Sequence, residues 1–361
     1  MRKLAIFGPL PPPMTGMEAF TTQLLAELRR RDGGSLTWRH ADTSISTSIE
    51  EREHFRARKI VWLLIQLVRS IRLAVTGYDA YAPLSQNRIG LVRDLVLLAP
   101  FRLARRRIVL HLHGGVFDEV FSEEPRWLRA CIRWLVGRPD ARGIVVAPSL
   151  RRCLEPILPP EQIFVVHNTV PDSGPAPLKD SIPPLRVLFI ATVMASKGYR
   201  ELIAAIMMLA DRGVPVRLEL AGQPYTDEDA RWLETLSHPA VKRLGYVGGE
   251  AKTQALQRAH VLAQPSTAPE GQPFSILEGM AAGCAVIATR WPGIADSVNE
   301  DNGILVPPAA GKELERALGD ALAELAADPD QVEELGRAAR IRFERELSPD
   351  RFFERWREAV M

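Results

Sequence analysis

The sequence predicts an α/β protein made of two doubly wound domains that face each other across a cleft. Short strand-like runs alternate with longer helix-like patterns along nearly the whole chain of 361 residues, a length that suits two domains of ordinary size. The segment from Val170 to Leu185 interrupts this alternation with five prolines, the composition of an inter-domain linker. Hydrophobic residues make up 46% and charged residues 25%, which excludes a disordered or fibrous chain.

The first half alternates between apolar runs of strand length and amphipathic segments of helix length. The runs predict strands at Leu4–Phe7, Leu36–His40, Tyr78–Leu84, Ile108–His113, Ile144–Ala147 and Ile163–Val166. The amphipathic segments predict helices at Met17–Arg31, Phe55–Val75, Ile89–Leu103 and Pro125–Val136. This alternation indicates a parallel sheet with helices on both faces.

The same alternation restarts after the proline-rich segment. Strands are expected at Val187–Ile190, Val216–Leu220, Val241–Tyr246, Val261–Ala263, Ala285–Ala288 and Gly303–Val306. Helices are expected at Tyr199–Asp211, Asp227–Leu236, Ala251–Ala259 and Phe274–Ala282, with three more near the end, the last at Pro349–Val360. Open parallel sheets bind ligands at the carboxyl ends of their strands, so we expect the site between the two halves.

The charge distribution and the cysteine content indicate the cellular compartment and the character of the two halves. Residues 1–180 carry 26 Lys and Arg against 18 Asp and Glu, and the remainder carries 20 against 26, so a basic half precedes an acidic half. Cys131, Cys153 and Cys284 are too few and too scattered for a disulfide framework or a zinc site, which favours a reducing, cytoplasmic setting. No secretory signal is visible, and the apolar run Ile60–Val68 is too short to span a membrane.

The most specific pattern is Glu270-Gly-Gln-Pro-Phe-Ser-Ile-Leu-Glu278, placed between a strand and a helix. The free amides near Phe274, Ser275 and Ile276 and the positive end of the helix dipole form a natural phosphate seat. The two acids need not share a task, because Glu270 stays on the loop and Glu278 lies a turn into the helix. The alternative is that Glu278 complements the helix dipole and Glu270 is solvated. No G-x-G-x-x-G or P-loop pattern occurs, which disfavours a dehydrogenase or a P-loop NTPase.

Several motifs together resemble the retaining GT-B glycosyltransferases of family four, the group 1 glycosyl transferases. They are the Glu-x7-Glu pattern, the following Gly279-Met-Ala-Ala-Gly283, Pro292-Gly293, Val166-His-Asn168, Leu188 to Gly198 with its Lys197-Gly198 pair, and Asn302 to Pro307. The resemblance implies two Rossmann-like domains. It divides the chain into an acceptor-binding domain at 1–170, a linker at 171–185, a nucleotide-sugar domain at 186–342 and a helix at 343–361 that crosses back to the first domain.

The resemblance also implies roles for the site residues. Glu270 would contact hydroxyls of the donor sugar, Glu278 would hold the ribose of the nucleotide, and Lys197 would neutralise the diphosphate. Fixed cations and amides stabilise the negative charge that develops on a departing nucleoside diphosphate. The alternative for Lys197 is an exposed lysine at a helix start. Where the family has Gly-Arg, this chain reads Ala191-Thr192, so one diphosphate cation is missing.

Two further segments of the first half are candidates. Thr15 and Gly16 fall in a loop after the first strand that resembles the family's flexible loop, with Thr15 in place of a glycine. The Gly16 amide could bind a phosphate at the start of the following helix. The alternative is that the loop is a plain turn between a strand and a helix. Strand alternation places His111 and His113 on the same side. By resemblance His113 would approach the donor sugar and the reacting centre, whereas His111 fits a structural role.

No metal or other cofactor is expected. Two histidines lack the third ligand of a catalytic zinc, and the Asp-x-Asp pairs at Asp227–Asp229 and Asp328–Asp330 lie at helix starts, where aspartate caps. The resemblance implies front-face substitution, in which the leaving phosphate helps to deprotonate the acceptor.

Basic residues accompany an apolar helical segment with Trp62 in the first half. They are Arg56, Arg58, Lys59, Arg69 and Arg72, followed later by Arg102, Arg105, Arg106 and Arg107. Such a surface can lie on anionic lipid, or it can be the charged rim of an ordinary core helix. Nucleic acid is not expected as a partner, since no aromatic stacking pattern accompanies the arginines.

These observations predict a cytoplasmic glycosyltransferase, peripheral to the inner face of the cell membrane if the basic surface docks there. The donor would be a nucleoside-diphosphate sugar, with UDP or GDP favoured, and the acceptor a saccharide or lipid-linked saccharide of a bacterial surface polysaccharide. Decoration of a small soluble acceptor is the alternative enzyme. A non-catalytic, membrane-docked partner of another transferase is the alternative of a different class, suggested by Thr192.

Overall fold

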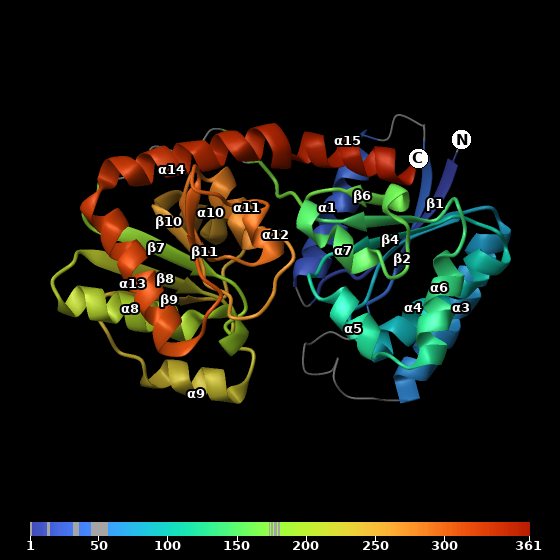
Figure 1. The fold of residues 1–361 in the computed structure, drawn as a ribbon, viewed down its shortest axis with the longest axis horizontal. Helices are drawn as coiled ribbons and strands as arrows, with labels where there is room; N and C mark the ends of the chain where they lie inside the picture. Colours follow the sequence, from blue (N-terminus) through green and yellow to red (C-terminus); the bar gives the residue numbers. More distant parts are fainter. Residues whose placement is uncertain are drawn as a thin grey trace. The chain divides into compact units, whose positions relative to one another are not determined.

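The chain folds into two compact units. The computed structural model describes residues 2–12, 15–31, 36–44, 57–172, 174, 176, 179 and 181–361, without the side chains of residues 57 and 58. The first unit combines Met1–Asn168 with Phe352–Met361, and the second is Thr169–Arg351 (Figure 1). The predicted linker residues 171–185 therefore group with the second unit, and so do residues 343–351 of the predicted crossover helix.

The first unit contains a parallel sheet of six strands in the order β2-β1-β3-β4-β5-β6. The strands are β1 (Arg2–Gly8), β2 (Leu36–Asp42), β3 (Asp79–Pro83), β4 (Ile108–Leu112), β5 (Arg142–Val145) and β6 (Ile163–Val165). Every strand predicted for this half is present, with ends that differ by one to a few residues. The order reverses at β1, so the chain runs first to one side of β1 and then crosses to the other.

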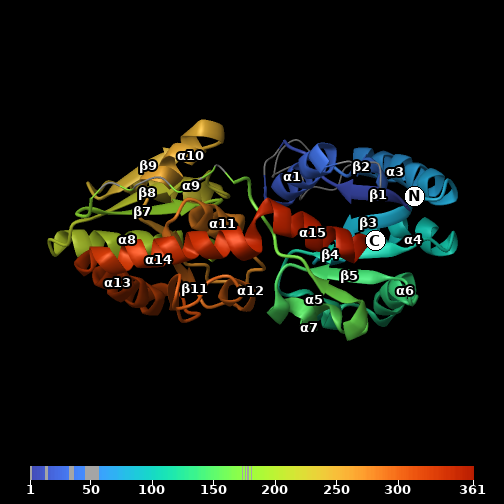
Figure 2. The ribbon, with the colours of Figure 1, turned by 90° about the horizontal axis from the view of Figure 1, so that it is seen from above.

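That reversal decides which face each helix covers, because crossovers between parallel strands are right-handed. The helices are α1 (Gly16–Arg31), α3 (Ala57–Val75), α4 (Arg88–Leu103), α5 (Phe117–Glu123), α6 (Arg126–Val136), α7 (Arg151–Leu154) and α15 (Pro349–Val360). Helices α3, α4 and α6 lie side by side on one face, and α1 and α15 cover the other (Figures 1 and 2). The short helices α5 and α7 had no predicted counterpart.

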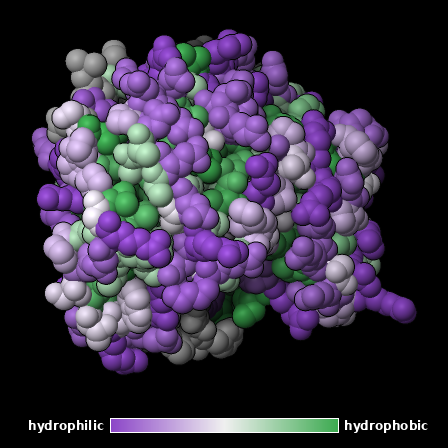
Figure 3. Space-filling view, turned by 60° about the vertical axis from the view of Figure 1, so that its left-hand side comes forward, coloured by the Kyte–Doolittle hydropathy of each residue, from purple (hydrophilic) through white to green (hydrophobic). Residues whose placement is uncertain are grey.

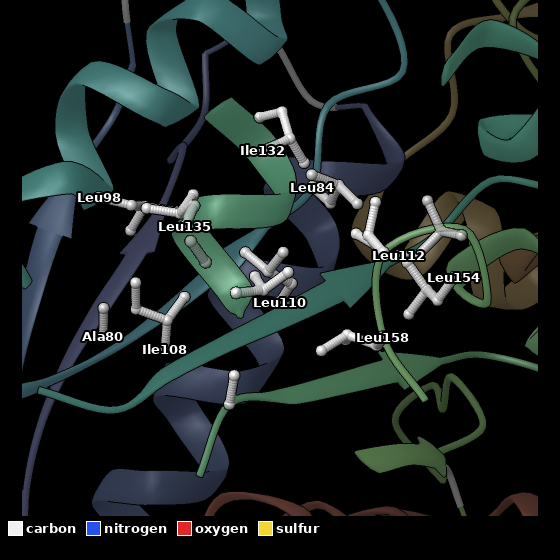
Figure 4. Packing of buried hydrophobic residues seen from close by; sticks show 14 of the residues in the cluster. Ala80, Leu84, Leu98, Ile108, Leu110, Leu112, Ile132, Leu135, Leu154 and Leu158 are labelled. Atoms are coloured by element: carbon white, nitrogen blue, oxygen red, sulfur yellow. The ribbon is translucent and has the colours of Figure 1, made fainter. Parts of the chain in front are cut away.

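Aliphatic side chains from the strands and from α4, α6 and α7 fill the space beneath that first helical layer. Leu110 of β4, Leu98 of α4 and Leu135 of α6 are almost completely buried and belong to one cluster (Figure 4). Strands buried on both faces read as continuous apolar runs, which is why these segments could be recognised as strands.

The second unit repeats the architecture with six parallel strands in the order β12-β11-β10-β7-β8-β9. The strands are β7 (Leu185–Ile190), β8 (Val216–Ala221), β9 (Val241–Gly245), β10 (Val261–Gln264), β11 (Ala285–Thr289) and β12 (Gly303–Val306). The helices are α8 (Tyr199–Asp211), α9 (Asp227–Thr235), α10 (Gly249–Arg258), α11 (Phe274–Ala281), α12 (Pro292–Ala295), α13 (Gly311–Ala327) and α14 (Pro329–Arg342). All strands and the main helices expected here are present, whereas α12 was not expected.

Two hydrophobic clusters occupy the two faces of this second sheet. One joins β7 and β8 to α8 and α13, with Leu202 and Leu318 fully buried. The other joins the opposite sides of β10 and β11 to α10, α11 and α14, with Ile276 and Ala339 fully buried. The second cluster therefore fixes α11, the helix that begins just after the loop with Glu270.

Helix α15, the last helix of the chain, packs against the first unit. Trp356 is completely buried with its ring 5.6 Å from that of Tyr81, and Phe352 lies 5.9 Å from Phe20. Arg142 of β5 donates to the carbonyls of Glu358 and Ala359, both at 2.8 Å, which satisfies acceptors that a helix end leaves open. Within the portion of the chain that the structure describes, no helix is both long and apolar enough to cross a bilayer.

Arg340 of α14 ties together three segments of the second unit, and its replacement by alanine should destabilise that unit. Its guanidinium donates to Asp172 at 2.8 Å, to Glu344 at 2.7 Å and to the carbonyl of Ala281 at 2.7 Å. Since hydrogen bonds to charged groups contribute about 1.5–3 kcal/mol each and two of these acceptors stay solvated, we expect a loss of about 1–3 kcal/mol by calorimetry. Exposed Arg337 on the same helix is the control, and equal unfolding midpoints for the two alanine variants would contradict this role.

Candidate functional site

The candidate site lies where the strand order of the second sheet reverses. Strand β7 has β8 on one side and β10 on the other, and the chain departs from it in both directions. In open parallel sheets, ligands bind beside the carboxyl ends of the strands at such a reversal, which is where the loops after β7 and β10 begin. The loop after β7 carries Lys197, and the loop after β10 carries Glu270.

Lys197 and Glu270 form an ion pair across these two loops. The Lys197 ammonium contacts Oε1 of Glu270, and the Ser266 hydroxyl donates to the same oxygen at 2.8 Å. The two charged side chains are 24% and 18% exposed, so the pair is largely shielded but reachable from solvent. The structure thus brings two of the predicted donor-binding residues into contact, although they are far apart in the sequence.

Backbone contacts hold the two loops at this spacing. The amide of Thr267 donates to the carbonyl of Ser196 at 2.9 Å. Gly198 has a φ of 67°, and a Cβ there would lie 1.9 Å from the carbonyl oxygen of Pro265. A side chain at position 198 would therefore push the loops apart, which explains physically why glycine follows the lysine.

A polar network connects the start of α11 to the ion pair. The Ser275 hydroxyl donates to the side-chain carbonyl of Gln264 at 2.7 Å, and the Gln264 amide donates to the Ser266 hydroxyl at 2.9 Å. The sequence reasoning missed Gln264 and Ser266, although a polar residue at the carboxyl end of an otherwise apolar strand was an available signal.

The predicted phosphate seat is the amino end of α11. The helix begins after Pro273, whose side chain offers no cap to the first amides. Phe274 and Ser275 are half-buried, whereas the side chain of Ile276 is completely buried in the core. Ile276 can therefore present only its backbone amide to a ligand.

Glu278 lies one turn further along α11 and pairs with Lys252 of α10. Burial raises the pKa of the Glu278 carboxyl, and the charge and hydrogen bond of Lys252 oppose that effect. The sequence did not predict Lys252, because nothing local marks a lysine on α10 as the partner of an acid 26 positions later.

Helix α12 supports the Glu270 loop from the other side. The indole nitrogen of Trp291 donates to the carbonyl of Ser266 at 2.8 Å. A Cβ at Gly293 would lie 1.9 Å from the carbonyl oxygen of Gly271, so the Pro292-Gly293 motif allows the backbone of α12 to reach this loop. The motif therefore has a packing role that its sequence alone did not reveal.

Thr192, at the position where the resemblance leads one to expect an arginine, is half-buried just beyond the end of β7. A nearby arginine in the sequence, Arg200, is committed elsewhere. Its guanidinium contacts Glu228 at 3.1 Å and Asp229 at 3.3 Å, and its Nε donates to the Tyr199 hydroxyl at 2.9 Å. Arg200 is therefore engaged in contacts with α9 and Tyr199 and does not stand in for the expected arginine.

In the first unit, Thr15 and Gly16 lie at the start of α1, where Glu18 accepts from the Thr15 amide. The Glu18 carboxylate accepts from the Thr15 amide at 3.1 Å and from the Thr15 hydroxyl, in the manner of a capping box. Glu18 is completely buried. The role of Thr15 and Gly16 in phosphate binding stays a prediction, and any anion there would compete with this carboxylate. Pro13 and Met14 of the same loop lie outside the described residues.

His111 and His113 lie side by side at the carboxyl end of β4, as strand alternation predicts. Their ring centroids are 4.0 Å apart, although β4 ends at Leu112 and not at His113. The Tyr81 hydroxyl lies 2.5 Å from Nδ1 of His111, and burial raises the pKa of Tyr81, so the phenol stays protonated. Burial also lowers the pKa of His111 well below its ordinary value, as expected for a structural histidine.

His113 is neutral at physiological pH. Burial lowers its pKa to about 3, and the nearby side chain of Asn168 opposes this effect by favouring the charged form. Both ring nitrogens are buried, although the residue keeps some exposure, and among the residues that the structure describes neither nitrogen has a hydrogen bond of ordinary geometry. Asn168 of the Val166-His-Asn168 motif thus lies against His113, a proximity that the motif did not indicate.

The described parts of the chain contain no group of three or more His, Cys, Asp or Glu side chains arranged to hold a metal ion. Asp328 caps α14 by accepting from the Gln331 amide at 3.1 Å, as predicted. The prediction that aspartate caps α9 is wrong. Thr226 is the cap, and Asp229 accepts from Tyr199 and Thr226 instead.

Parts of the chain are similar in sequence to known glycosyltransferases. Residues 184–328 match the family model described as "Glycosyl transferases group 1". A relative in Escherichia coli (strain K12), which is named as the colanic acid biosynthesis glycosyltransferase WcaL, is 28% identical over 48% of this chain and 44% of its own length. The amylovoran biosynthesis glycosyltransferase AmsK of Erwinia amylovora is 26% identical over 53% of this chain and 48% of its own length. The chain thus matches about half the length of these curated relatives.

The solved structures extend the likeness to the whole chain. HepE of Anabaena, in a complex with UDP and glucose, has a TM-score of 0.71 at 20% identity and covers 100% of this chain and 99% of its own. Sucrose-phosphate synthase from Thermosynechococcus elongatus has a TM-score of 0.73 at 17% identity, covering 100% and 98%. The chain therefore has the fold of GT-B glycosyltransferases, two Rossmann-like units, and its segment with Lys197, Glu270 and Glu278 matches group 1 of the glycosyl transferases.

Proposed function

We propose that this protein is a retaining glycosyltransferase that moves a sugar from a nucleoside-diphosphate sugar to an acceptor hydroxyl. The observation that carries the proposal is the contact between Lys197 and Glu270 at the strand-order reversal of the second sheet, beside the start of α11, where Pro273 has no capping side chain. A cation, a set of backbone amides and a carboxylate are the groups needed to hold a diphosphate and a sugar hydroxyl together.

Binding of the proposed donor would replace contacts that the side chains of the candidate site now make with one another. Lys197 would turn from Glu270 to the diphosphate, whose charge grows as the sugar departs, and Glu270 would accept from a sugar hydroxyl. Glu278 would accept from the ribose, which requires its contact with Lys252 to open or to be shared. Because both acids already have a lysine partner, neither is left as an unpaired charge before the donor binds.

The proposal includes front-face substitution with retention and no metal or other cofactor, since Lys197 and the α11 amides supply the positive field. His113 would act as a neutral hydrogen-bonding group, because its lowered pKa keeps the imidazole uncharged. UDP is the first donor base to test, since HepE has been solved with UDP and with UDP-glucose, and GDP is the second.

We propose an acceptor in the assembly of a bacterial surface polysaccharide, a saccharide or lipid-linked saccharide, supported by the names of WcaL and AmsK. The proposed location is the cytoplasm, at the inner face of the cell membrane. The second candidate is a non-catalytic partner of another transferase, which Thr192 favours because it removes a diphosphate cation.

The central experiment is thermal unfolding with UDP, GDP, ADP, dTDP and CDP. A diphosphate at 100 times its dissociation constant stabilises the native state by about 2.7 kcal/mol, so one of the five should raise the midpoint of the wild-type protein. Glu278→Ala should lose most of that shift, and Lys197→Ala should weaken affinity roughly 10–100-fold, as expected for a lost charge-assisted hydrogen bond.

Glu333→Ala, which removes an exposed acid of α14, is the matched control and should keep the full shift. If no diphosphate shifts the midpoint at millimolar levels, the transferase proposal fails and the non-catalytic candidate replaces it. Equal affinity in wild type and Glu278→Ala would remove only the ribose assignment.

Glu270→Gln should separate turnover from binding. The substitution releases Lys197 from its ion pair, so affinity for the free diphosphate should stay equal or rise. Turnover, measured as hydrolysis of the donor without acceptor, should fall about 100-fold, because a contact to the reacting sugar is lost. Weakened diphosphate binding with unchanged turnover would contradict the assignment.

His113→Gln should flatten the dependence of stability on pH. The folded protein binds a proton at His113 only near pH 3, whereas the unfolded chain does so near pH 6.5, so the unfolded state holds more protons between these values. Stability is therefore full above about pH 6.5 and falls as the pH drops, by up to about 1.4 kcal/mol per pH unit for one such group. Urea unfolding of the wild-type protein and of His113→Gln between about pH 7 and 4.5 would measure this loss of stability. If the free energy of unfolding changed equally with pH in the two proteins, a buried neutral His113 would be refuted.

A further inference from the structure

Helix α3 of the first unit turns an apolar face outward. Seven aliphatic side chains on it are 45–67% exposed: Ile60, Val61, Leu64, Ile65, Val68, Ile71 and Val75. Val61, Leu64, Val68, Ile71 and Val75 follow one another at steps of three and four, which places them on one continuous stripe. By contrast, hydrophilic side chains cover most of the face drawn in Figure 3, with apolar ones in small groups.

The inward face of α3 is fixed and partly polar, so the outward apolar stripe is not a rotated core face. Gln66 is 7% exposed and donates to the carbonyl of Asp42 at 3.0 Å, and Ser70 is completely buried. Leu73 and Ala74 belong to the core of the first unit. An ordinary surface helix has the reverse arrangement, and an exposed apolar surface of this extent marks an interaction site.

The charges of α3 are all of one sign. The residues from Ala57 to Val75 include four basic residues and no acidic one. Arg72 is exposed, and Arg69 is exposed with its guanidinium anchored on the carbonyl of His40 at 2.7 Å. Arg56 of the predicted basic surface lies outside the described residues, and the side chain of Arg58 is not described.

The end of the neighbouring helix α4 extends this basic and apolar surface. Arg106 donates to the carbonyl of Ala74 at 3.2 Å, which places the end of α4 beside the end of α3. There Leu103 is 72% exposed, and Arg105 is exposed two residues later. Apolar and cationic groups therefore continue from one helix to the other.

We infer that the outward face of α3 docks on an anionic phospholipid surface. A helix with one apolar and one basic side lies in the membrane interface, with its aliphatic side chains among the acyl chains and its cations at the headgroups. At 1.5 Å per residue, the 19 residues of α3 extend ~28 Å along that surface. A second copy of α3 would offer Arg69 and Arg72 only like charges, since the helix has no acid.

This inference does not require the proposed sugar transfer, because docking can be measured without donor or acceptor. We would follow co-sedimentation of the full chain with vesicles of phosphatidylglycerol and phosphatidylethanolamine, and with vesicles of phosphatidylcholine alone. The wild-type protein should bind the anionic vesicles, and salt should weaken that binding. The double variant Leu64→Gln, Val68→Gln should bind about tenfold or more weakly, since two aliphatic groups no longer enter the bilayer.

The matched control is the double variant Tyr246→Gln, Ile341→Gln, which removes two exposed apolar side chains of the second unit and should bind like wild type. Both α3 substitutions are at exposed positions, so calorimetry should show wild-type unfolding. Equal binding to phosphatidylcholine, or unchanged binding of the α3 variant, would overturn the inference. A wild-type dimer that the α3 variant converts to a monomer, without vesicle binding by either, would overturn it in favour of a second copy as the partner.

Discussion

The reversal of strand order within each sheet is the constraint on which the rest of this structure depends. Crossovers between parallel strands are right-handed, so a chain that changes direction must place its helices on opposite faces and open its loops at the point of reversal. In the second unit this point lies between β7 and β10. Lys197 and Glu270 meet there because each lies on the loop that follows one of these strands.

Once the loops are placed, close backbone approaches hold the charged groups. Gly198 lets the loop after β7 rest on Pro265, and Gly293 lets α12 rest on Gly271. The Ser275–Gln264–Ser266 chain then connects the start of α11 to Glu270. The proposed donor-binding groups are thus supported by residues that need not touch a ligand, and such support would keep the site close to its working geometry.

The first unit has the same architecture as the second unit, but its edge and its helical layer carry different side chains. Its carboxyl edge buries two neutral histidines beside Tyr81 and Phe20, a low-dielectric environment that disfavours positive charge. Its helical layer ends in α3, whose inward face is partly polar and whose outward face carries an apolar stripe.

The sequence alone determined the strands, most helices, the two-unit division and the pattern from Glu270 to Glu278, because apolar periodicity and glycine or proline positions are local properties. It did not reveal Lys252 as the partner of Glu278, Thr226 as the cap of α9, or Glu18 as the group at the start of α1. Nor could it say which face of α3 is buried, since a helical period gives two faces without saying which one packs on the core. These matters were decided by tertiary structure, because burial and ion pairing depend on which distant segments the sheet brings together.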